Sequence, residues 1–151
     1  MYRITREIPF CYGHRLLNYK GKCANLHGHN GLAVITLESA ELDEQGMVVD
    51  FTEIRTLVSS WIDQFIDHKL LLHKDDPALA ALQKMNEPLF VMEVNPTAEN
   101  IAKLIFDQAK SKGLPVVEVT LWETTNCFAT YREGARANTE AHELTLTAKN
   151  S

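Results

Sequence analysis

The sequence predicts an α+β domain in which an antiparallel sheet carries two helices on one face. Three observations predict this class. The first 42 residues read as strands, apolar positions between residues 54 and 66 recur at helical spacing, and β-branched strand patterns return after Gly113. Strands and helices that fall in separate blocks are typical of α+β folds. We expect one domain over residues 1–134, followed by a polar tail over 135–151.

The N-terminal part reads as strands that end in a turn. Within residues 32–37, apolar or β-branched side chains occupy both faces of the strand. We therefore expect this strand to be covered on both faces, with Leu32, Val34 and Thr36 on one and Ala33, Ile35 and Leu37 on the other. Residues 43–46 predict a turn, and residues 47–49 a short strand after it.

A long amphipathic helix is predicted after this turn. Its apolar positions follow one helix face, through Ile54, Leu57, Val58, Trp61, Ile62, Phe65 and Ile66. Asp50 or Thr52 is the candidate N-cap, and the helix ends near Asp67-His68. Asp76-Pro77 opens a shorter helical piece, with proline at the favoured first position.

A second long helix is predicted to begin after residues 95–97 and to stop at Gly113. Its inner face carries Ile101, Leu104, Ile105 and Ala109. Strands are then expected over residues 116–122 and 127–132. Two alternatives stay open for the tail, which is either partly disordered or adds an edge strand over 142–147.

The composition argues against several functional classes. A formal charge of −5 disfavours sequence-independent nucleic-acid binding, which needs a basic face. The sequence has no run of about 20 apolar residues, so we expect no membrane-spanning helix. Its first residues lack the apolar core of a signal peptide. The cysteines, Cys11, Cys23 and Cys127, show no CxxC spacing, which favours a reduced, cytoplasmic protein.

Three histidines form a candidate metal site. In a strand, residues i and i+2 project from the same face, so His27 and His29 can present two imidazoles to one point. If the strand that ends at His14 pairs antiparallel with this one, His14 adds a third. Three imidazoles with one open position are typical of catalytic zinc. The alternative is that the motif arose by chance at the surface or in the core.

Cys23, four residues before His27, has three interpretations. It can be a fourth zinc ligand that closes a structural site. It can instead be a base or nucleophile beside an open metal, with its thiolate favoured by the cation. The third interpretation is a buried, small apolar residue.

Two further positions are candidates for proton transfer or binding. Asp67-His68 closes the long helix, where the carboxylate can set the tautomer of the histidine at the rim of a pocket. Glu123 follows a strand and can accept paired N–H groups from a guanidine-like heterocycle; a solvated strand end is its alternative. His73 and His142 are expected to be exposed.

Together these residues resemble the 6-pyruvoyltetrahydropterin synthase family, which includes the 6-carboxytetrahydropterin synthases. The resemblance spans residues 1 to about 132 and rests on six segments that occur in the same order as in the family. The segments are Phe10-Cys11-Tyr12-Gly13-His14, Cys23-Ala24-Asn25-Leu26-His27-Gly28-His29, Val48-Val49-Asp50-Phe51, Asp67-His68, Asn95-Pro96-Thr97-Ala98-Glu99-Asn100 and Trp122-Glu123-Thr124.

The resemblance implies a tunnelling fold (T-fold), in which sheets of several subunits close into a barrel and sites form at subunit interfaces. A homo-oligomer, hexameric or tetrameric, is the expected assembly. Zinc is the implied cofactor, held by His14, His27 and His29.

The family pattern also implies roles for the remaining candidates. Cys23 corresponds to a base, and the Asp67–His68 pair to the second proton-transfer group. Glu123 corresponds to the residue that anchors the pterin, and Thr97 to a further contact with the ring.

The short spacing Cys-x3-His-Gly-His is similar to that of the bacterial 6-carboxytetrahydropterin synthases of queuosine biosynthesis. The implied reaction converts 7,8-dihydroneopterin triphosphate to 6-carboxy-5,6,7,8-tetrahydropterin, with release of acetaldehyde and triphosphate. Two alternatives stay open. One is the pyruvoyl-forming lyase reaction on the same substrate, and the other is a non-catalytic zinc protein in which Cys23 is the fourth ligand.

Some features depart from the family or are left unassigned by the resemblance. Gly31 stands where a bulkier residue often follows the histidine pair, which affects the expected shape of the pocket. Arg15, Lys20 and Lys22 are candidates for the triphosphate site. The tail beyond Gly134 exceeds the typical family length.

Overall fold

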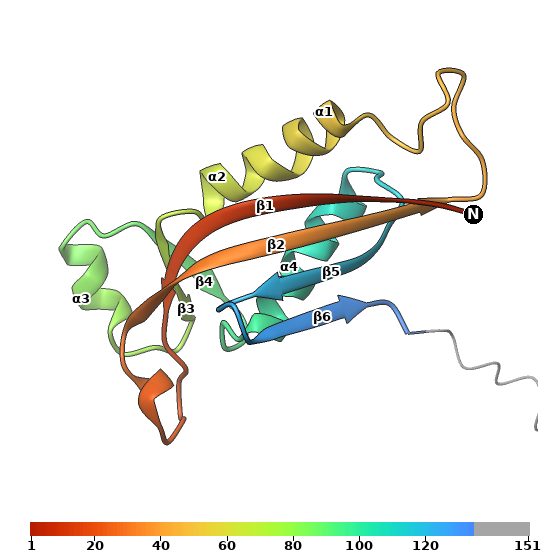
Figure 1. The fold of residues 1–151 in the computed structure, drawn as a ribbon. Coiled ribbons are helices and arrows are strands. Elements are labelled where there is room, and N and C mark those ends of the chain that lie inside the picture. Colours follow the sequence, from red (N-terminus) through yellow and green to blue (C-terminus); the bar gives the residue numbers. More distant parts are fainter. Residues whose placement is uncertain (135–151) are drawn as a thin grey trace, which may run out of the picture.

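The protein, described from a computed structural model over residues 1–134, is built on one six-stranded sheet in the order β4-β3-β1-β2-β5-β6 (Figure 1). Its centre is the antiparallel pair of β1 (Tyr2–His14) and β2 (His27–Ser39), which are joined along their whole length. Strands β5 (Val116–Trp122) and β6 (Phe128–Arg132) extend the sheet, again antiparallel. The α+β class predicted from the sequence is confirmed.

Alternation along β2 determines which face of the sheet carries the core. The side chains of Ala33, Ile35 and Leu37 are completely buried. On the opposite face Thr36 is buried, but Leu32 and Val34 are only half-buried. Within one chain the second face is therefore only partly covered, short of the expectation from the sequence.

Two short strands were not predicted. β3 (Lys69–His73) pairs with the end of β1, and β4 (Leu89–Met92) pairs with β3, both in parallel. The sheet is therefore mixed at this edge. Apolar runs this short have no period that separates a strand from a helix, so their pairing depends on tertiary structure.

The strand predicted over residues 47–49 does not form. The Asp43 carboxylate accepts hydrogen bonds from the backbone N–H of Gln45 and of Met47, which fixes a loop at this point. Val48 and Val49 pack against the core from that loop, without a strand partner. Their apolar character therefore reflects packing rather than β-pairing.

The first predicted helix forms in three consecutive pieces. α1 (Phe51–Ile54) begins at Asp50, whose carboxylate accepts the N–H of Thr52, and a π-helical turn, η2 (Arg55–Ser59), leads into α2 (Ser60–Phe65). Most of the predicted apolar stripe faces the sheet, because Ile54, Val58, Ile62 and Ile66 are buried, but Phe65 at its end is 40% exposed. The shorter helical piece is α3 (Leu79–Lys84).

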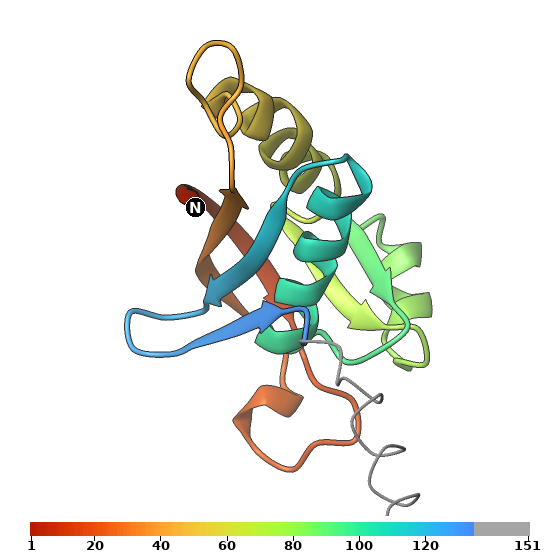
Figure 2. The same ribbon diagram turned by 90° about the vertical axis from the view of Figure 1, so that its right-hand side faces the viewer.

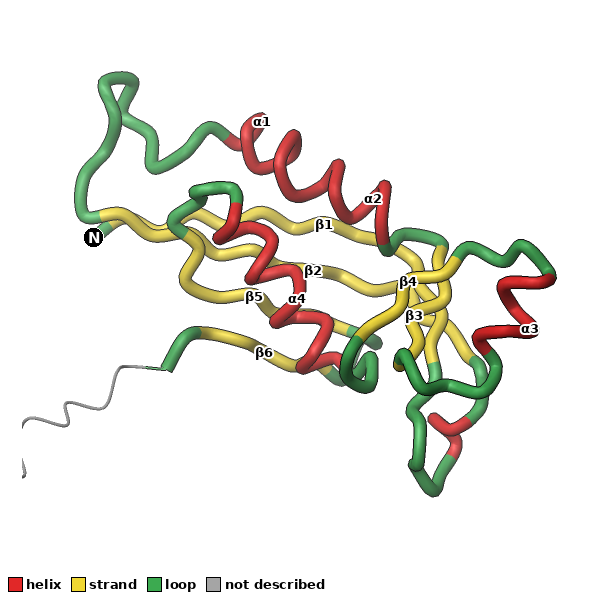
Figure 3. The backbone as a smooth tube through the Cα atoms, turned by 180° about the vertical axis from the view of Figure 1, so that it is seen from behind, coloured by secondary structure: helices red, strands yellow, loops and turns green. Residues whose placement is uncertain are grey.

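The second long helix is α4 (Ala98–Ser111). Thr97 caps its start, and Gly113 follows its end with a positive φ of 82°, a conformation that glycine adopts without strain. Seen from behind, α1, α2 and α4 all cover the same face of the sheet (Figure 3). The two predicted helices thus enclose one core between helices and sheet.

The connection between β1 and β2 projects from one end of the sheet (Figures 1 and 2) and contains the short helical turn η1 (Lys22–Ala24). The strand ends at His14 and His27 lie at its base. Over residues 1–134 the structure contains no helix long and apolar enough to cross a membrane. The predicted edge strand at 142–147 and His142 lie outside the described residues.

Candidate metal centre and active site

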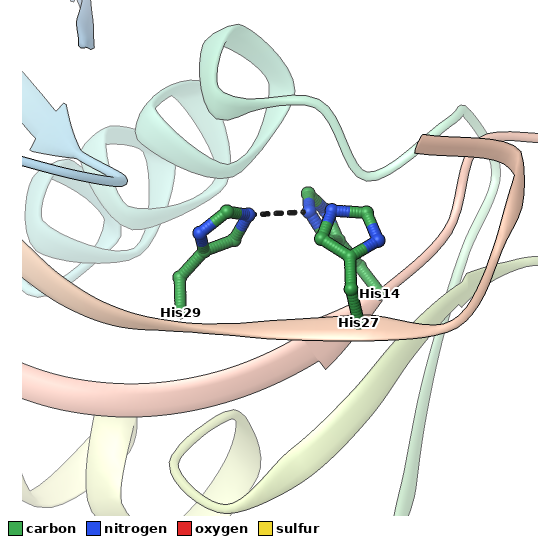
Figure 4. A group of neighbouring side chains, drawn as sticks. All are labelled: His14, His27 and His29. Atoms are coloured by element: carbon green, nitrogen blue, oxygen red, sulfur yellow. Dashed lines mark hydrogen bonds between the residues drawn. The ribbon is translucent and has the colours of Figure 1, made fainter. Parts of the chain in front are cut away.

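Three imidazoles meet at the base of the projecting connection (Figure 4). The β1–β2 register sets His14 opposite His27 and Tyr12 opposite His29, so all four side chains lie on the helix-covered face. The Nε2 atoms of His14 and His29 are 3.1 Å apart, and one ring nitrogen of each histidine lies within 4.8 Å of the others. The predicted convergence of these three histidines is confirmed.

Backbone carbonyls orient two of these rings. Nδ1 of His14 lies 2.6 Å from the carbonyl oxygen of Pro96, and Nδ1 of His27 lies 2.7 Å from that of Asn25. A carbonyl only accepts, so each Nδ1 donates its proton and each Nε2 carries a lone pair. Burial lowers the pKa of His14, which favours its neutral form. Two imidazoles with free Nε2 lone pairs beside a third imidazole form a donor set that suits a bound cation, so the residues present fit zinc.

Cys23 lies in η1 and lines a cavity of about 360 Å³ together with His14, His29, Thr97 and Glu123. Its carbonyl oxygen accepts the N–H of Leu16, which ties the turn to the end of β1. Its sulfur does not belong to the group of ligand atoms that lie within 4.8 Å of one another in the described chain. Cys23 thus shares one cavity with four other candidate site residues, namely His14, His29, Thr97 and Glu123.

Glu123 follows β5 and points into this cavity instead of ending in solvent. Its Oε1 atom accepts a hydrogen bond from the Tyr12 hydroxyl at 3.0 Å and lies 3.7 Å from Nε2 of His14 and 4.0 Å from Nε2 of His29. The backbone N–H of Glu123 bonds to the carbonyl of Cys127 and closes the β5–β6 turn. The carboxylate is therefore held beside the three imidazoles.

Thr97 has a structural role in addition to its place in the cavity wall. Its Oγ1 atom accepts the N–H of Asn100 at 3.3 Å and caps α4. Pro96, one residue earlier, holds His14. The start of α4 thus positions a candidate metal ligand.

The Asp67–His68 pair forms, but on the opposite side of the sheet. Asp67 Oδ2 is 2.9 Å from Nδ1 of His68, and its Oδ1 accepts the backbone N–H of Cys11. His68 has a positive φ of 56° and an exposed side chain. It lines a second cavity, of about 620 Å³, whose floor includes Cys11, Gly13, Gly28 and Asn30. Strand alternation directs these four positions away from the imidazole face.

The basic candidates for the triphosphate differ in their surroundings. Arg15 makes two hydrogen bonds through Nε and a terminal nitrogen to the carboxylate of Asp76, which is only 1% exposed. Lys20 and Lys22 are exposed on the projecting connection. Arg15 is therefore held mainly as a structural residue at the edge of the site.

Asp76→Asn is expected to lower the free energy of unfolding by about 2 kcal/mol at neutral pH, because a charged hydrogen-bonded pair is lost from a buried position. The hydrogen bond from Arg15 holds the pKa of Asp76 below its ordinary value. The stabilisation is thus present at neutral pH and is lost as the pH falls below about 4, through the pKa of the folded state. Urea unfolding at pH 7 and pH 3 tests this; a difference between wild type and variant that is as large at pH 3 as at pH 7 contradicts it.

Sequence reasoning missed three residues around the site. Tyr12 shares the face of His14 by its spacing of two, a signal that was present in the sequence. Asp76 appeared only as a helix opener, and Asn95, whose side chain bonds the backbone N–H and C=O of Leu17, only as part of a turn. His73 was expected to be exposed, but its side chain is only 19% exposed because β3 is flanked by β1 and β4.

Comparison with known proteins adds independent information. The model of the family "6-pyruvoyl tetrahydropterin synthase" matches residues 3–134. The chain belongs to this family. It is thus an enzyme of a lyase-type family of pterin synthases, as the sequence predicted.

Two relatives of this pterin synthase carry the same name, 6-carboxy-5,6,7,8-tetrahydropterin synthase. The one from Rickettsia typhi is 40% identical over 139 residues, which cover 85% of this chain and 98% of the relative. The one from Haemophilus influenzae is 32% identical over 142 residues, covering 88% and 100%. The solved 6-pyruvoyl tetrahydropterin synthase of Caenorhabditis elegans has the same fold, with a TM-score of 0.66 at 24% identity over 88% of this chain and 96% of that one. The T-fold prediction is thereby confirmed.

Proposed function

We propose that this chain is a zinc-dependent lyase that converts 7,8-dihydroneopterin triphosphate and one water molecule to 6-carboxy-5,6,7,8-tetrahydropterin, acetaldehyde and triphosphate. The observation that carries the proposal is the cavity in which Cys23 and Glu123 lie beside His14 and His29. The carboxy product is supported by the relatives at 32–40% identity that are named for it. We further propose a role in queuosine biosynthesis and a cytoplasmic location, the latter favoured by cysteines without CxxC spacing.

We assign each side chain of the cavity a separate role in this reaction. His14, His27 and His29 would hold zinc, which when bound supplies Lewis-acid polarisation of the substrate side chain. Cys23 removes a proton from that side chain as general base. Glu123 holds the aminopyrimidine ring by paired hydrogen bonds and fixes its position relative to Cys23.

The second proton-transfer group comes from a neighbouring subunit in this proposal. Within one chain the sheet separates His68 from Cys23, because the two line cavities on opposite faces. A homo-oligomer, hexameric or tetrameric, can bring the Asp67–His68 pair of one subunit against the Cys23 cavity of the next. The half-buried second face of β2 is consistent with such an assembly.

Mixing two inactive variants tests the shared site. Cys23→Ala and His68→Ala are each expected to be inactive alone. Oligomers reassembled from equal amounts of both should recover roughly a quarter of wild-type activity, since random pairing rejoins an intact Cys23 with an intact His68 at about one site in four. Activity no greater than the sum of the two separate variants contradicts a site shared between subunits.

Product analysis tests the proposed reaction itself. Zinc-loaded protein is incubated with 7,8-dihydroneopterin triphosphate, and the products are identified by mass spectrometry. The proposal predicts 6-carboxytetrahydropterin with one acetaldehyde per turnover. A pyruvoyl product moves the chain to the sister reaction on the same substrate, and unchanged substrate with verified zinc rejects the proposed substrate.

A further inference from the structure

The ring of Tyr12 lies at the centre of the candidate site. It is 3% exposed and stacks on Phe10 with ring centroids 5.3 Å apart. It also contacts two of the three imidazoles, with centroids 5.2 Å from that of His14 and 5.6 Å from that of His29. Because the ring is packed on several sides, its hydroxyl has a defined position.

That hydroxyl is directed at Glu123. It donates to Oε1 across 3.0 Å, between residues 111 positions apart in the sequence. A phenol has an ordinary pKa of about 10, so the Tyr12 hydroxyl is protonated at physiological pH and serves as the donor in this bond.

Gly31 explains how the ring fits. A Cβ atom at this position would lie 2.9 Å from Cε1 of Tyr12 and 3.4 Å from the carbonyl oxygen of Phe10, its partner across the β1–β2 pair. Gly31 is not among the residues with positive φ, so space and not backbone conformation requires glycine here. The missing side chain at position 31 leaves the volume that the Tyr12 ring fills.

We propose that Tyr12 is a positioning residue that holds the Glu123 carboxylate toward the pterin ring, and that Gly31 provides the space this tyrosine needs. The inference rests on the proposed function for the identity of the ligand. The inference goes beyond the proposed function because it attributes the shape of the pocket to Tyr12 and Gly31, which lie on adjacent strands.

The hydrogen bond from Tyr12 restrains the Glu123 carboxylate, which could otherwise bind either the pterin or the imidazole cluster. With Oε1 only 3.7 Å from a ring nitrogen of His14, an unrestrained Glu123 can turn toward the imidazole cluster. A carboxylate offers about four lone-pair sites, so one bond from Tyr12 leaves both oxygens able to accept N–H groups of an aminopyrimidine. In the described hydrogen bonds Oε2 of Glu123 has no partner, which leaves it available to a ligand.

Tyr12→Phe removes the hydroxyl and keeps the ring. The dissociation constant for 7,8-dihydroneopterin and the KM for its triphosphate are expected to rise about tenfold, the effect of one hydrogen bond to a charged group. The kcat should stay within about threefold, and the zinc content should not change. Tyr131→Phe is the matched control, because Tyr131 on β6 packs on Phe106 of α4 and not on the imidazoles. This variant should bind the pterin with wild-type affinity. Unchanged pterin affinity in Tyr12→Phe overturns the inference.

Gly31→Ala tests the space from the other strand. It should weaken pterin binding at least as much as Tyr12→Phe, because the new Cβ displaces the ring. In a Tyr12→Ala background the same substitution should have little further effect. An equal loss in both backgrounds shows that Gly31 acts independently of Tyr12 and rejects the proposed pairing.

A double-mutant cycle measured without ligand tests the Tyr12–Glu123 contact separately from the proposed function. Thermal unfolding is measured for Tyr12→Phe, Glu123→Ala and the double variant. The loss in melting temperature caused by Tyr12→Phe should shrink to less than half when Glu123 is alanine. Such coupling in a protein that binds no pterin supports the positioning of Glu123 and rejects the pterin function. Pterin binding without coupling, and with full affinity in Tyr12→Phe, supports the function and rejects the inference.

Discussion

Replacement of Cys23 by alanine is expected to lower kcat by about 10²–10⁴-fold while zinc content and melting temperature stay near wild type. The side chain is only partly buried in η1, so its truncation leaves no large cavity in the core. Its sulfur also lies outside the group of close ligand atoms formed by the histidines. Steady-state turnover and metal analysis on the same preparation test this expectation.

Cys127→Ala is the matched control for this variant. Cys127 lines the same cavity but is exposed in the β5–β6 turn, and it has no assigned proton-transfer role. It should retain activity within about threefold, since most surface substitutions have small effects. Loss of zinc together with unfolding in Cys23→Ala would instead favour the interpretation of Cys23 as a fourth ligand of a structural site.

Replacement of His29 by alanine is expected to remove both zinc and activity. Only two imidazoles would remain, and the loss in affinity should exceed the roughly 10–100-fold that follows loss of an outer-shell partner. His29 is preferable to His14 for this test, because His14 is 3% exposed and its removal also affects the core. Zinc is measured after dialysis against a weak chelator, with circular dichroism to verify the fold.

His73→Ala provides the comparison for the metal. This histidine lies on β3, close to Asp75 and outside the imidazole cluster. The variant should keep one zinc per chain and near-normal turnover. If His29→Ala retains zinc as tightly as His73→Ala does, the three histidines do not form the metal centre.

Local pattern was sufficient to predict the imidazole cluster. The spacing of two between His27 and His29 puts both on one face, and an antiparallel partner strand brings His14 to them. The caps of the helices, Asp50 and Thr97, also follow from local sequence. These features depend on residues close in sequence or on one strand pair.

Features that depend on distant packing could not be predicted in the same way. The position of His68 on the far face follows from the parallel pairing of β3 with β1, which short apolar runs do not reveal. The hydrogen bond of Tyr12 to Glu123 joins two strands that are not neighbours, and the space at Gly31 has meaning only beside that ring. Glu123 alone therefore looked like a solvated strand end.

The proposed centre is an open three-histidine zinc site beside a cysteine that does not bind the metal. Zinc content combined with zinc K-edge X-ray absorption distinguishes it from a closed site. We expect one zinc per chain with imidazole nitrogens at about 2.0–2.1 Å and no sulfur in the coordination shell. A sulfur neighbour at about 2.3 Å, lost in Cys23→Ala, would instead show a closed structural site and rule out the open centre.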